Sequence, residues 1–345
     1  MIRLGVIFGG KSGEHEVSLM SATSVLKAID RNKYTPIMIG IDRKGNWKLY
    51  EGEVDHIEDG SWEKSAVPLP IDDLKKTADI FLPIVHGTYS EDGTLQGFLE
   101  ILDIPYAGCG VLASAAAMDK LIAKRLFEQE GLPSCRYTGV IVSQFQEEDV
   151  PKIAEAVGGY PCFVKPANLG SSVGVSKAAN DQELLAAIRK AGKFDRRLII
   201  EEGLNIREVE TAVIGNDEPI VSVAGEITPS AEFYDYTAKY FDGGQSKLTV
   251  PANLPEETAE KIRDYAKRAY KALDCAGFAR VDFFVEKDTG EVYINEINTI
   301  PGFTKFSMFP VLFGASGIAY PTLIERIVDY GYERYNIKNS RQTNL

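Results

Sequence analysis

The sequence predicts an α/β protein whose N-terminal part is a doubly wound, mostly parallel sheet and whose remainder is of the α+β class. Up to about residue 117, short apolar strands alternate with helices, the order that builds a parallel sheet covered on both faces. Beyond Pro133, strands follow one another with fewer helices between them, which is typical of α+β domains. The 345 residues are enough for two or three domains with their own cores.

In the N-terminal part we expect three apolar strands and one clear amphipathic helix. The strands span 3–8, 35–41 and 80–85, and the helix spans 17–30. The loops 9–16 and 86–93 follow two of these strands. Ligands of doubly wound sheets gather beyond the carboxyl ends of the strands, so we expect these loops to line a ligand site.

A long helix, 113–130, separates the two parts and is stopped by Gly131 and Pro133. Beyond it we expect strands at 137–142, 162–165, 173–177, 198–202, 208–213 and 221–227, a helix at 255–273, a hairpin at 279–298 and a helix at 320–335. This order gives domains at 1–117, 118–208 and 209–335, with 336–345 as a frayed tail.

The composition argues against several classes of protein. The formal net charge of −12 disfavours nucleic acids and anionic membranes as partners, since both rely on a basic face. No apolar run reaches the roughly 18 residues that span a bilayer, and the first residues lack the pattern of a signal peptide. The four cysteines form no CxxC pair, so neither a disulfide framework nor a zinc knuckle is expected. A cytoplasmic location fits these features best.

Two β-like segments, 279–285 and 291–298, give the strongest chemical signal. If 288–290 form a three-residue hairpin loop, Asp282 lies opposite Glu296, and Asn298 shares their face. Opposed carboxylates repel unless a positive group lies between them. A hard divalent cation such as Mg²⁺, bound together with substrate phosphates, is the simplest candidate. The alternative is an exposed hairpin with solvated acids.

A second signal is the small-residue loop Gly-Ser-Ser-Val-Gly at 170–174, which follows the strand that ends at Lys165. Small residues let backbone N–H groups approach phosphate oxygens, and the lysine supplies charge for the same phosphates. An ordinary flexible turn is the alternative. Two other glycine motifs do not predict nucleotide binding: in the GxxxxGKS match at 5–12, Gly5 lies inside a strand, and the GxGxxA match at 108–113 lies deep in the domain.

Other charged and aromatic residues leave two interpretations open. Lys120 is the only singled-out lysine on its helix, so the sequence alone predicts a solvated side chain. Glu201 and Glu208 are either solvated or hydrogen-bonded to adenine and ribose. The connection 228–249 holds three tyrosines and Lys239; its length predicts a lid, with surface packing of the aromatics as the alternative. The histidines lack metal-ligand spacing, so no zinc site is expected.

Seven motifs in register, running from the first strand to about residue 330, resemble the D-alanine–D-alanine ligase family. They are residues 9–18, 86–97, 118–120, Lys165 with 170–174, 234–240, 279–282 and 295–302. The resemblance implies a two-subdomain ATP-grasp fold after the N-terminal domain, with ATP between the two subdomains. It further implies ATP as co-substrate, two Mg²⁺ ions (or Mn²⁺), a homodimer, and two D-alanines joined through an acyl phosphate for peptidoglycan synthesis.

The same resemblance implies a role for each matching residue. Glu14 would hold the ammonium of the first D-alanine, with His86 near its carboxylate, and would form a hydrogen-bonded set with Ser171 and Tyr240. Arg280 and the Gly302 amide would stabilise the oxyanion, and Ser307, beside Met308, would bind the second carboxylate. The residues implied to contact ATP are Lys120, Lys165, Ser171, Ser172, Glu201, Leu204, Glu208 and Lys239, and those implied to hold the metal are Asp282, Glu296 and Asn298.

The resemblance also bears on the second substrate. Tyr240 and the run Phe306-Ser-Met308 look like the D-alanine pattern, so D-alanine is expected at both positions. Glu202 and Thr237 depart from the family, where lysine and glutamate are common, and they affect only adenine contacts and lid packing. The alternatives are a D-lactate or D-serine ligase, another ATP-grasp carboxylate–amine ligase, or a nucleotide-binding regulatory protein without turnover.

Overall fold

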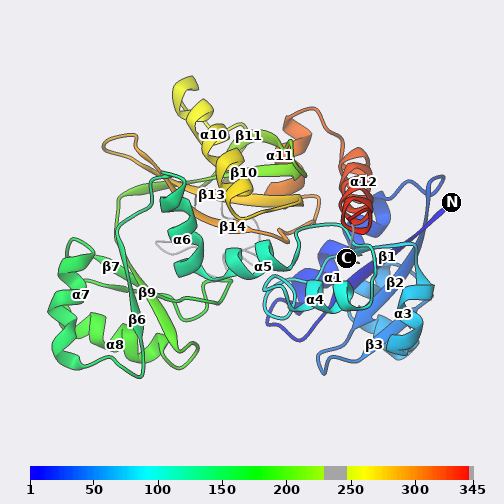
Figure 1. Cartoon of the computed structure of the whole chain (residues 1–345), viewed down its shortest axis with the longest axis horizontal. Coiled ribbons are helices and arrows are strands. Elements are labelled where there is room, and N and C mark those ends of the chain that lie inside the picture. The colour runs from blue at the N-terminus through cyan, green and yellow to red at the C-terminus, as the bar shows by residue number, and fades with distance from the viewer. Residues whose placement is uncertain (229–246, 342–345) are drawn as a thin grey trace.

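The computed structural model describes residues 1–228 and 247–341, which form three β-sheets with helices packed against them. Figure 1 shows the first sheet at one end of the molecule, the second at the other end, and the third between them. The helices α5 (Val111–Met118) and α6 (Lys120–Gln129) run through the middle and connect the first sheet to the second.

The first sheet has the strand order β4-β3-β2-β1-β5. Its strands β1 (Ile2–Gly9), β2 (Tyr34–Ile41) and β5 (Ile80–Pro83) are parallel, and the antiparallel strands β3 (Trp47–Tyr50) and β4 (Val67–Pro68) extend one edge. Leu4, Val6 and Phe8 pack with α1 (His15–Ala28), while Ile7 packs on the opposite face with residues of α3 (Ile71–Thr77) and α4 (Thr94–Ile101). The doubly wound, mostly parallel sheet is thus confirmed, and the two antiparallel edge strands are an addition to the prediction.

The second sheet is antiparallel, in the order β6-β9-β7-β8. It consists of β6 (Tyr137–Ile141), β9 (Arg197–Glu202), β7 (Cys162–Pro166) and the short β8 (Ser176–Ala178). The helices α7 (Val150–Ala156) and α8 (Asp181–Ala191) cover one face through a small apolar core that includes Val164, Leu184 and Ile188. Its other face is turned toward the third sheet and carries Lys165 and Glu201.

The third sheet is also antiparallel, in the order β12-β11-β10-β13-β14. Its strands are β12 (Lys247–Thr249), β11 (Ile220–Thr228), β10 (Ile206–Gly215), β13 (Gly277–Glu286) and β14 (Val292–Asn298). α10 (Glu256–Ala272) covers one face. On the opposite face, Ala212 and Ile214 pack against α11 (Met308–Ala315), while Glu208 and Glu210 of the same strand line cavities. Because β10 begins at Ile206, the expected boundary after residue 208 falls inside a strand; the domain limits stay predictions.

The single helix expected at 113–130 is divided in two at Asp119. The Asp119 carboxylate accepts a hydrogen bond from Ile122 N–H (3.1 Å) and forms an ion pair with Arg197. An aspartate that caps N–H groups in this way begins a new helix. Lys120 is therefore the first residue of α6, and its backbone N–H donates to Ala167 O (2.9 Å), next to the predicted phosphate loop.

The C-terminal helix α12 (Tyr320–Asn339) is longer than expected, so the prediction of a frayed tail from residue 336 is wrong as far as Asn339. The end of the helix is held by contacts with the N-terminal part: Lys338, in the added turn, forms an ion pair with Glu100, and Tyr335, just before it, donates from Oη to Asp103 (3.1 Å). These partners are distant in sequence, which is why the sequence pattern of the helix alone did not reveal its full length. Residues 342–345 lie outside the described residues.

Among the described residues, no single helix has both the length and the apolar character needed to cross a membrane. Only α11 and α12 taken together reach those criteria, and the two helices meet at 105°. Phe309, Leu312 and Phe313 of α11 are buried in the same core as Leu323 and Ile327 of α12.

Candidate active site

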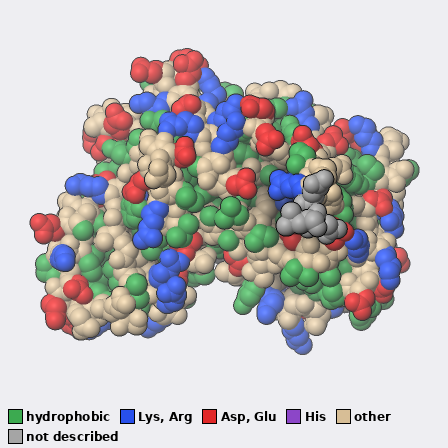
Figure 2. Space-filling view, in the orientation of Figure 1, with side chains coloured by type: hydrophobic (Ala, Val, Ile, Leu, Met, Phe, Trp, Pro, Cys, Tyr) green, Lys and Arg blue, Asp and Glu red, His purple; other side chains and the backbone are tan. Residues whose placement is uncertain are grey.

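Two adjoining cavities lie where the three sheets approach one another. One, of about 1050 Å³, is bordered by α1, the third sheet and the start of α11. The other, of about 590 Å³, lies between the second and third sheets. In Figure 2 the surface is hollowed beside the lobe that carries α7 and α8. Both cavities are lined by Lys120, Gly170, Ser171, Ile227 and Glu296, so ligands in the two cavities would meet at these residues.

The cavities bring together most of the residues singled out in the sequence. The first is lined by Glu14, Ser171, Arg280, Glu296, Asn298, Gly302, Ser307 and Met308, with further residues. The second is lined by Lys120, Lys165, Ser171, Ser172, Glu201, Leu204, Glu208 and Glu296, with further residues. Lys239 and Tyr240, and with them most of the predicted lid, lie outside the described residues.

The predicted hairpin is present, but its loop is one residue longer than expected. Glu286 N–H donates to Glu291 O (2.9 Å), so four residues, not three, connect the strands. Continued without interruption, that register would place Asp282 opposite Asn295. A one-residue bulge in β14 shifts the register back, and Asp282 faces Glu296 as predicted.

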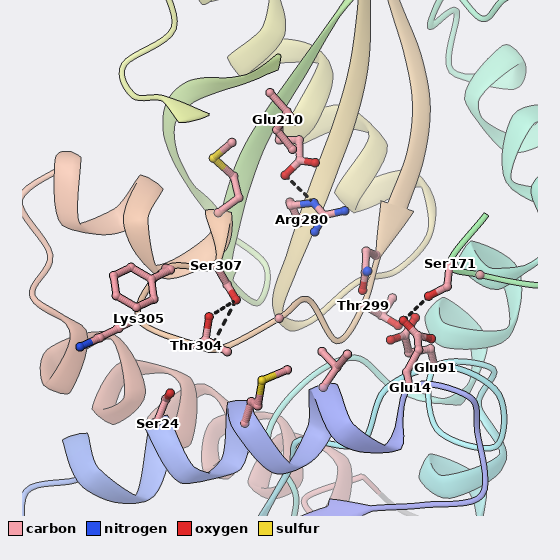
Figure 3. Close-up of a pocket in the computed structure, with 18 of the residues that line it drawn as sticks. Glu14, Ser24, Glu91, Ser171, Glu210, Arg280, Thr299, Thr304, Lys305 and Ser307 are labelled. Carbon is pink, nitrogen blue, oxygen red and sulfur yellow. Dashed lines mark hydrogen bonds and ion pairs between the residues drawn. The ribbon is translucent and has the colours of Figure 1, made fainter. Parts of the chain in front are cut away.

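Three carboxylate residues occupy directly opposed positions on three neighbouring strands. Glu210 of β10 pairs with Asp282 of β13, which pairs with Glu296 of β14. Arg280 lies two residues before Asp282 and so shares its face. Its Nε and Nη2 each lie 2.7 Å from an oxygen of Asp282. The same Nε lies 2.9 Å from Glu210 Oε2 (Figure 3). The positive group between Glu210 and Asp282 is thus Arg280.

The chemistry of the predicted metal ligands suits magnesium. Asp282, Glu296 and Asn298 offer carboxylate and amide oxygens from paired strands, and Mg²⁺ prefers such donors together with substrate phosphates. Within residues 1–228 and 247–341, no group of three or more His, Cys, Asp and Glu side chains is arranged to hold a metal by itself. Since only two of the predicted ligands are acids, the remaining donors would come from Asn298, the substrate and water.

Glu14 and Ser171, which come from different sheets' loops, meet at the wall of the first cavity. Ser171 Oγ donates a hydrogen bond to Glu14 Oε1 (Figure 3). Gly87 permits this position of Glu14, because a Cβ at Gly87 would lie 2.5 Å from Glu14 Oε2. Ser171 and Ser172 both adopt left-handed backbone conformations, with φ of 54° and 57°. Non-glycine residues rarely do so, and such conformations cluster at functional sites.

His86, expected near the carboxylate of the first D-alanine, is held inside the protein, and its closeness to that carboxylate stays a prediction. It is buried, and it is absent from the residues that line the first cavity. Its Nδ1 donates to Ile300 O (2.8 Å), and its Nε2 lies 3.1 Å from Ser21 Oγ. Ser21 Oγ in turn accepts from Phe303 N–H (3.2 Å). His86 therefore anchors the loop that carries Gly302.

The electrostatic environment of His86 favours its charged form. Burial alone would lower the pKa of His86, but Glu91, whose Oε1 lies 3.7 Å from Nδ1, and Glu14 raise that pKa above its ordinary value. Glu91 also stabilises the loop, because its Oε1 accepts a hydrogen bond from Gly87 N–H (3.0 Å). A buried imidazole with a raised pKa thus lies behind the acidic wall of the first cavity.

Gly302 and Ser307 lie close together at the start of α11. A Cβ at Gly302 would lie 2.8 Å from Ser307 Oγ, so only glycine leaves this serine in place. Thr304 N–H donates to Ser307 Oγ (3.1 Å), and the hydroxyls of Thr304 and Ser307 are 2.8 Å apart (Figure 3). Ser307 is the residue before the first turn of α11, and the N-terminus of a helix attracts carboxylates.

Lys120 is neither alone nor fully solvated, as the sequence by itself had suggested. Its Nζ donates to Leu169 O (2.7 Å) and lies 3.9 Å from Glu296 Oε2. It therefore stands between the phosphate loop and the acids of the hairpin, at the point that the two cavities share.

Glu201 lines the second cavity, but its carboxylate is already bound to two lysines. Lys124 Nζ lies 2.8 Å from Glu201 Oε1, and Lys165 Nζ lies 2.5 Å from Oε2. Burial opposes ionisation of Glu201, yet the two lysines hold the pKa of its carboxyl far below its usual range. The interpretation of Glu201 as a solvated residue is therefore wrong, and its carboxylate is oriented toward lysines.

Two important residues, Glu210 and Lys124, were missed in the sequence. The spacing of side chains along a strand or a helix could have indicated both residues. Glu210 lies two residues beyond Glu208 on one strand, hence on the same face. Lys124 lies four residues beyond Lys120 on one helix, hence one turn away on the same side.

This arrangement defines a class of enzyme. A cavity lies between an antiparallel sheet with a serine-rich loop on one side and a carboxylate-bearing antiparallel sheet on the other, and a second, larger cavity adjoins it. This is the organisation of the ATP-grasp fold. The sequence matches the family models described as D-ala D-ala ligase N-terminus, over residues 3–109, and D-ala D-ala ligase C-terminus, over residues 126–329. The chain therefore belongs to the D-alanine–D-alanine ligase family.

Individual relatives agree with this membership over nearly their full length. The chain is 49% identical to the D-alanine–D-alanine ligase of Thermoanaerobacter sp. (strain X514), covering 97% of this chain and 98% of that protein. It is 48% identical to the D-alanine–D-alanine ligase of Ruminiclostridium cellulolyticum, covering 99% of this chain and 98% of that protein.

Solved structures are similar as well. The D-alanine–D-alanine ligase of Coxiella burnetii aligns with a TM-score of 0.88 at 34% identity, covering 98% of this chain and 96% of that one. The VanG D-Ala:D-Ser ligase of Enterococcus faecalis aligns with a TM-score of 0.87 at 38% identity, covering 96% and 99%. The fold thus accommodates more than one second substrate.

Proposed function

We propose that this protein joins two molecules of D-alanine, with ATP as co-substrate, and so supplies D-alanyl-D-alanine for peptidoglycan synthesis. The observation that carries the proposal is the junction of the two cavities at Lys120, Ser171 and Glu296. At such a junction the terminal phosphate of a nucleotide meets the carboxylate of an amino acid. The balance is one ATP and two D-alanines consumed, and one dipeptide, one ADP, one phosphate and one proton formed.

In the first step, a carboxylate oxygen of the first D-alanine attacks the γ-phosphorus of ATP, and the bond from that phosphorus to the ADP oxygen breaks. Glu14 pairs with the ammonium of this D-alanine and fixes the direction of its carboxylate. Lys120 and Lys165 stabilise the phosphate charge, and the backbone around Ser171 and Ser172 lies along the phosphates. Positioning and electrostatic stabilisation account for most of the catalysis in phosphoryl transfer.

In the second step, the amine of the second D-alanine attacks the carbonyl carbon of the acyl phosphate, and collapse of the tetrahedral intermediate expels phosphate. Ser307 and the N-terminus of α11 bind the second carboxylate. Arg280 and the Gly302 N–H donate to the oxygen that becomes negative. Preorganised donors of this kind act where charge develops and usually contribute the largest share of such catalysis.

Asp282, Glu296 and Asn298 would hold the Mg²⁺ that accompanies ATP. When bound, magnesium neutralises phosphate oxygens and makes the γ-phosphorus easier to attack. Asp282 and Arg280 are ion-paired in this structure. We infer that Arg280 turns toward the carbonyl oxygen when Asp282 takes a metal, while Glu210 keeps hold of the guanidinium.

The second substrate is proposed to be D-alanine. Met308 is buried at the base of α11 and Phe306 projects from the rim with 72% of its surface exposed. These apolar neighbours of Ser307 suit a methyl side chain. Competition between D-alanine, D-lactate and D-serine at neutral pH tests the choice, and a mainly ester or D-alanyl-D-serine product would refute it.

The proposed reaction is tested with purified protein, ATP and Mg²⁺. Phosphate release should require D-alanine, and one ADP should form for each dipeptide. Glu14→Gln should raise the KM for D-alanine strongly while leaving ADP binding unchanged, because it removes a charge from the substrate cavity only. Phosphate release without D-alanine, or only with a different amino acid, would favour another ATP-grasp ligase or a regulatory ATPase.

Two further properties are proposed from the family and the composition alone. We expect a homodimer, which sedimentation equilibrium measures directly. We also expect the protein to act in the cytoplasm, where ATP is available, and fractionation of cells that express it tests this expectation.

A further inference from the structure

Lys124 is a buried cation that takes no part in the mechanism described above. It lies on α6, one turn after Lys120, and only 1% of its side chain is exposed. It is absent from the residues that line either cavity. Its Nζ lies 2.8 Å from Glu201 Oε1 and 5.6 Å from the centre of the Tyr137 ring.

The partner of Lys124 is also the partner of Lys165. Lys165 Nζ lies 2.5 Å from the other oxygen of Glu201, and unlike Lys124 it lines the nucleotide cavity. The three groups come from α6, β7 and β9, so the ion cluster forms only when these elements are assembled. Burying a charge is costly unless it is paired and hydrogen-bonded, and Glu201 is paired on both oxygens.

The charges of the cluster do not cancel. Burial would raise the pKa of Glu201, but the lysines hold it low. Burial would likewise lower the pKa of Lys165, but Glu201 raises it above its ordinary value. The carboxylate and Lys165 are therefore both charged at neutral pH. Two lysines, Lys124 and Lys165, share this one carboxylate, so a single acid faces two basic groups.

We propose that Lys124 is a positioning residue of the nucleotide site: it neutralises Glu201, so that the charge of Lys165 is left for the phosphates. Without Lys124, Lys165 remains as the partner of Glu201, and a neutral pair offers no net charge to the phosphates. Lys124 thus acts on the phosphates through Glu201 and Lys165, without touching them. This inference rests on the proposed assignment of the second cavity to ATP.

The decisive measurement is the Kd of ADP and of adenosine, by calorimetry at one fixed ionic strength. Lys124→Met should weaken ADP binding by about tenfold or more, the effect of about 1.4 kcal/mol. Adenosine lacks phosphates, so its Kd should change less than about twofold, and the KM for D-alanine should also be nearly unchanged. The preference for ADP over adenosine is a readout that a purely structural role would leave unaltered.

Further variants separate charge from packing. Lys124→Arg should keep ADP affinity within about threefold, because it preserves the charge. Lys124→Met combined with Glu201→Gln should bind ADP better than Lys124→Met alone, since it restores the net positive charge of the cluster. Arg125→Met is the matched control: it removes the same charge from the adjacent, exposed position of α6 and should leave the Kd of ADP unchanged.

Several outcomes would overturn the proposal. They are a Lys124→Met protein with the affinity of the parent for ADP, an equal loss of ADP and adenosine binding, or a double variant no better than the single one. If Lys124→Met does not fold, Lys124→Gln replaces it, because the amide can donate to Glu201 without carrying charge, and the same loss of ADP binding is expected.

A separate variant, Leu204→Asp, tests the assignment of the second cavity to ATP, because Leu204 lies in the wall of that cavity. Unchanged ADP binding in Leu204→Asp would refute the assignment. Weaker ADP binding in Leu204→Asp, with none in Lys124→Met, would refute only the role of Lys124.

Discussion

Arg280 and Asp282, two residues apart on β13, form a two-point ion pair in which Nε and Nη2 each lie 2.7 Å from a carboxylate oxygen. A planar guanidinium forms such a fork readily, whereas an ammonium group does not. The pair links the residue proposed to stabilise the oxyanion to a residue proposed to bind the metal. The third member, Glu210, also contacts the guanidinium, since its Oε2 lies 2.9 Å from the same Nε.

The first prediction concerns Arg280→Lys. Lysine keeps the charge but cannot keep both hydrogen bonds while reaching the carbonyl oxygen, so kcat should fall by about 100-fold or more, the usual effect of losing an oxyanion donor. The ADP Kd should be unchanged, because Arg280 lines only the substrate cavity. Steady-state kinetics with Arg263→Lys as control makes the comparison, because Arg263 is half-buried and lines neither cavity. A kcat within tenfold of the parent would show that Arg280 is not the donor.

The second prediction concerns Glu296→Gln. Removing this charge should abolish turnover at low Mg²⁺ and leave the thermal midpoint nearly unchanged, because Glu296 is half-buried at the cavity edge and carries no core packing. Glu291→Gln, on the same hairpin but exposed, is the control and should behave like the parent. Activity is measured across a magnesium titration. Normal activity of Glu296→Gln at low Mg²⁺ would contradict the metal assignment.

The third prediction concerns Gly302→Ala. The new Cβ would lie 2.8 Å from Ser307 Oγ and must displace that hydroxyl. Because Ser307 is proposed to bind the second D-alanine, the KM of the second site should rise by about tenfold, an effect of about 1.4 kcal/mol, and the KM of the first site should change much less. Gly314→Ala on α11, where a Cβ meets no atom within 4 Å, is the matched control. Equal changes at both sites would argue against the role of Ser307.

The fourth prediction concerns the pH dependence of stability through His86. Glu91 and Glu14 raise the pKa of His86 in the folded protein, against the opposing effect of burial. A histidine with a raised pKa contributes stability that is fully present below its unfolded pKa of about 6.5 and is lost as pH rises through the folded pKa. His86→Gln should therefore lower the thermal midpoint most at pH 6 and progressively less toward pH 9. A difference that grows with pH would reverse the assigned sign.

The hairpin of β13 and β14 shows which features of the site the sequence can predict. Alternation and one positive-φ glycine were enough to predict that Asp282 faces Glu296, and Gly290 does have a φ of 75°. The sequence predicted neither the extra loop residue nor the bulge in β14. These two irregularities compensate each other, so the pairing of Asp282 with Glu296 is the one predicted. The fold class was predictable for a similar reason: the order of strands and helices depends on local patterns that tertiary contacts did not override.

What the sequence did not reveal are contacts between distant segments. His86 lies in a loop that ligands were expected to line, but it is held by Ile300 and faces the interior. Lys124 and Glu201 are 2.8 Å apart through the packing of a helix on a sheet, and no local pattern records that distance. The break at Asp119 also depends on a partner, Arg197, in another strand.

The long C-terminal helix has a consequence for how the chain is made. Leu4, Val6 and Phe8 of the first strand share one apolar core with Leu323, Ile324 and Ile327 of α12. During synthesis, the first sheet therefore leaves the ribosome with part of that core open to water, and it stays open until α12 has emerged. Premature termination before Tyr320 would leave an apolar face uncovered on the N-terminal part, a form that chaperones and proteases recognise.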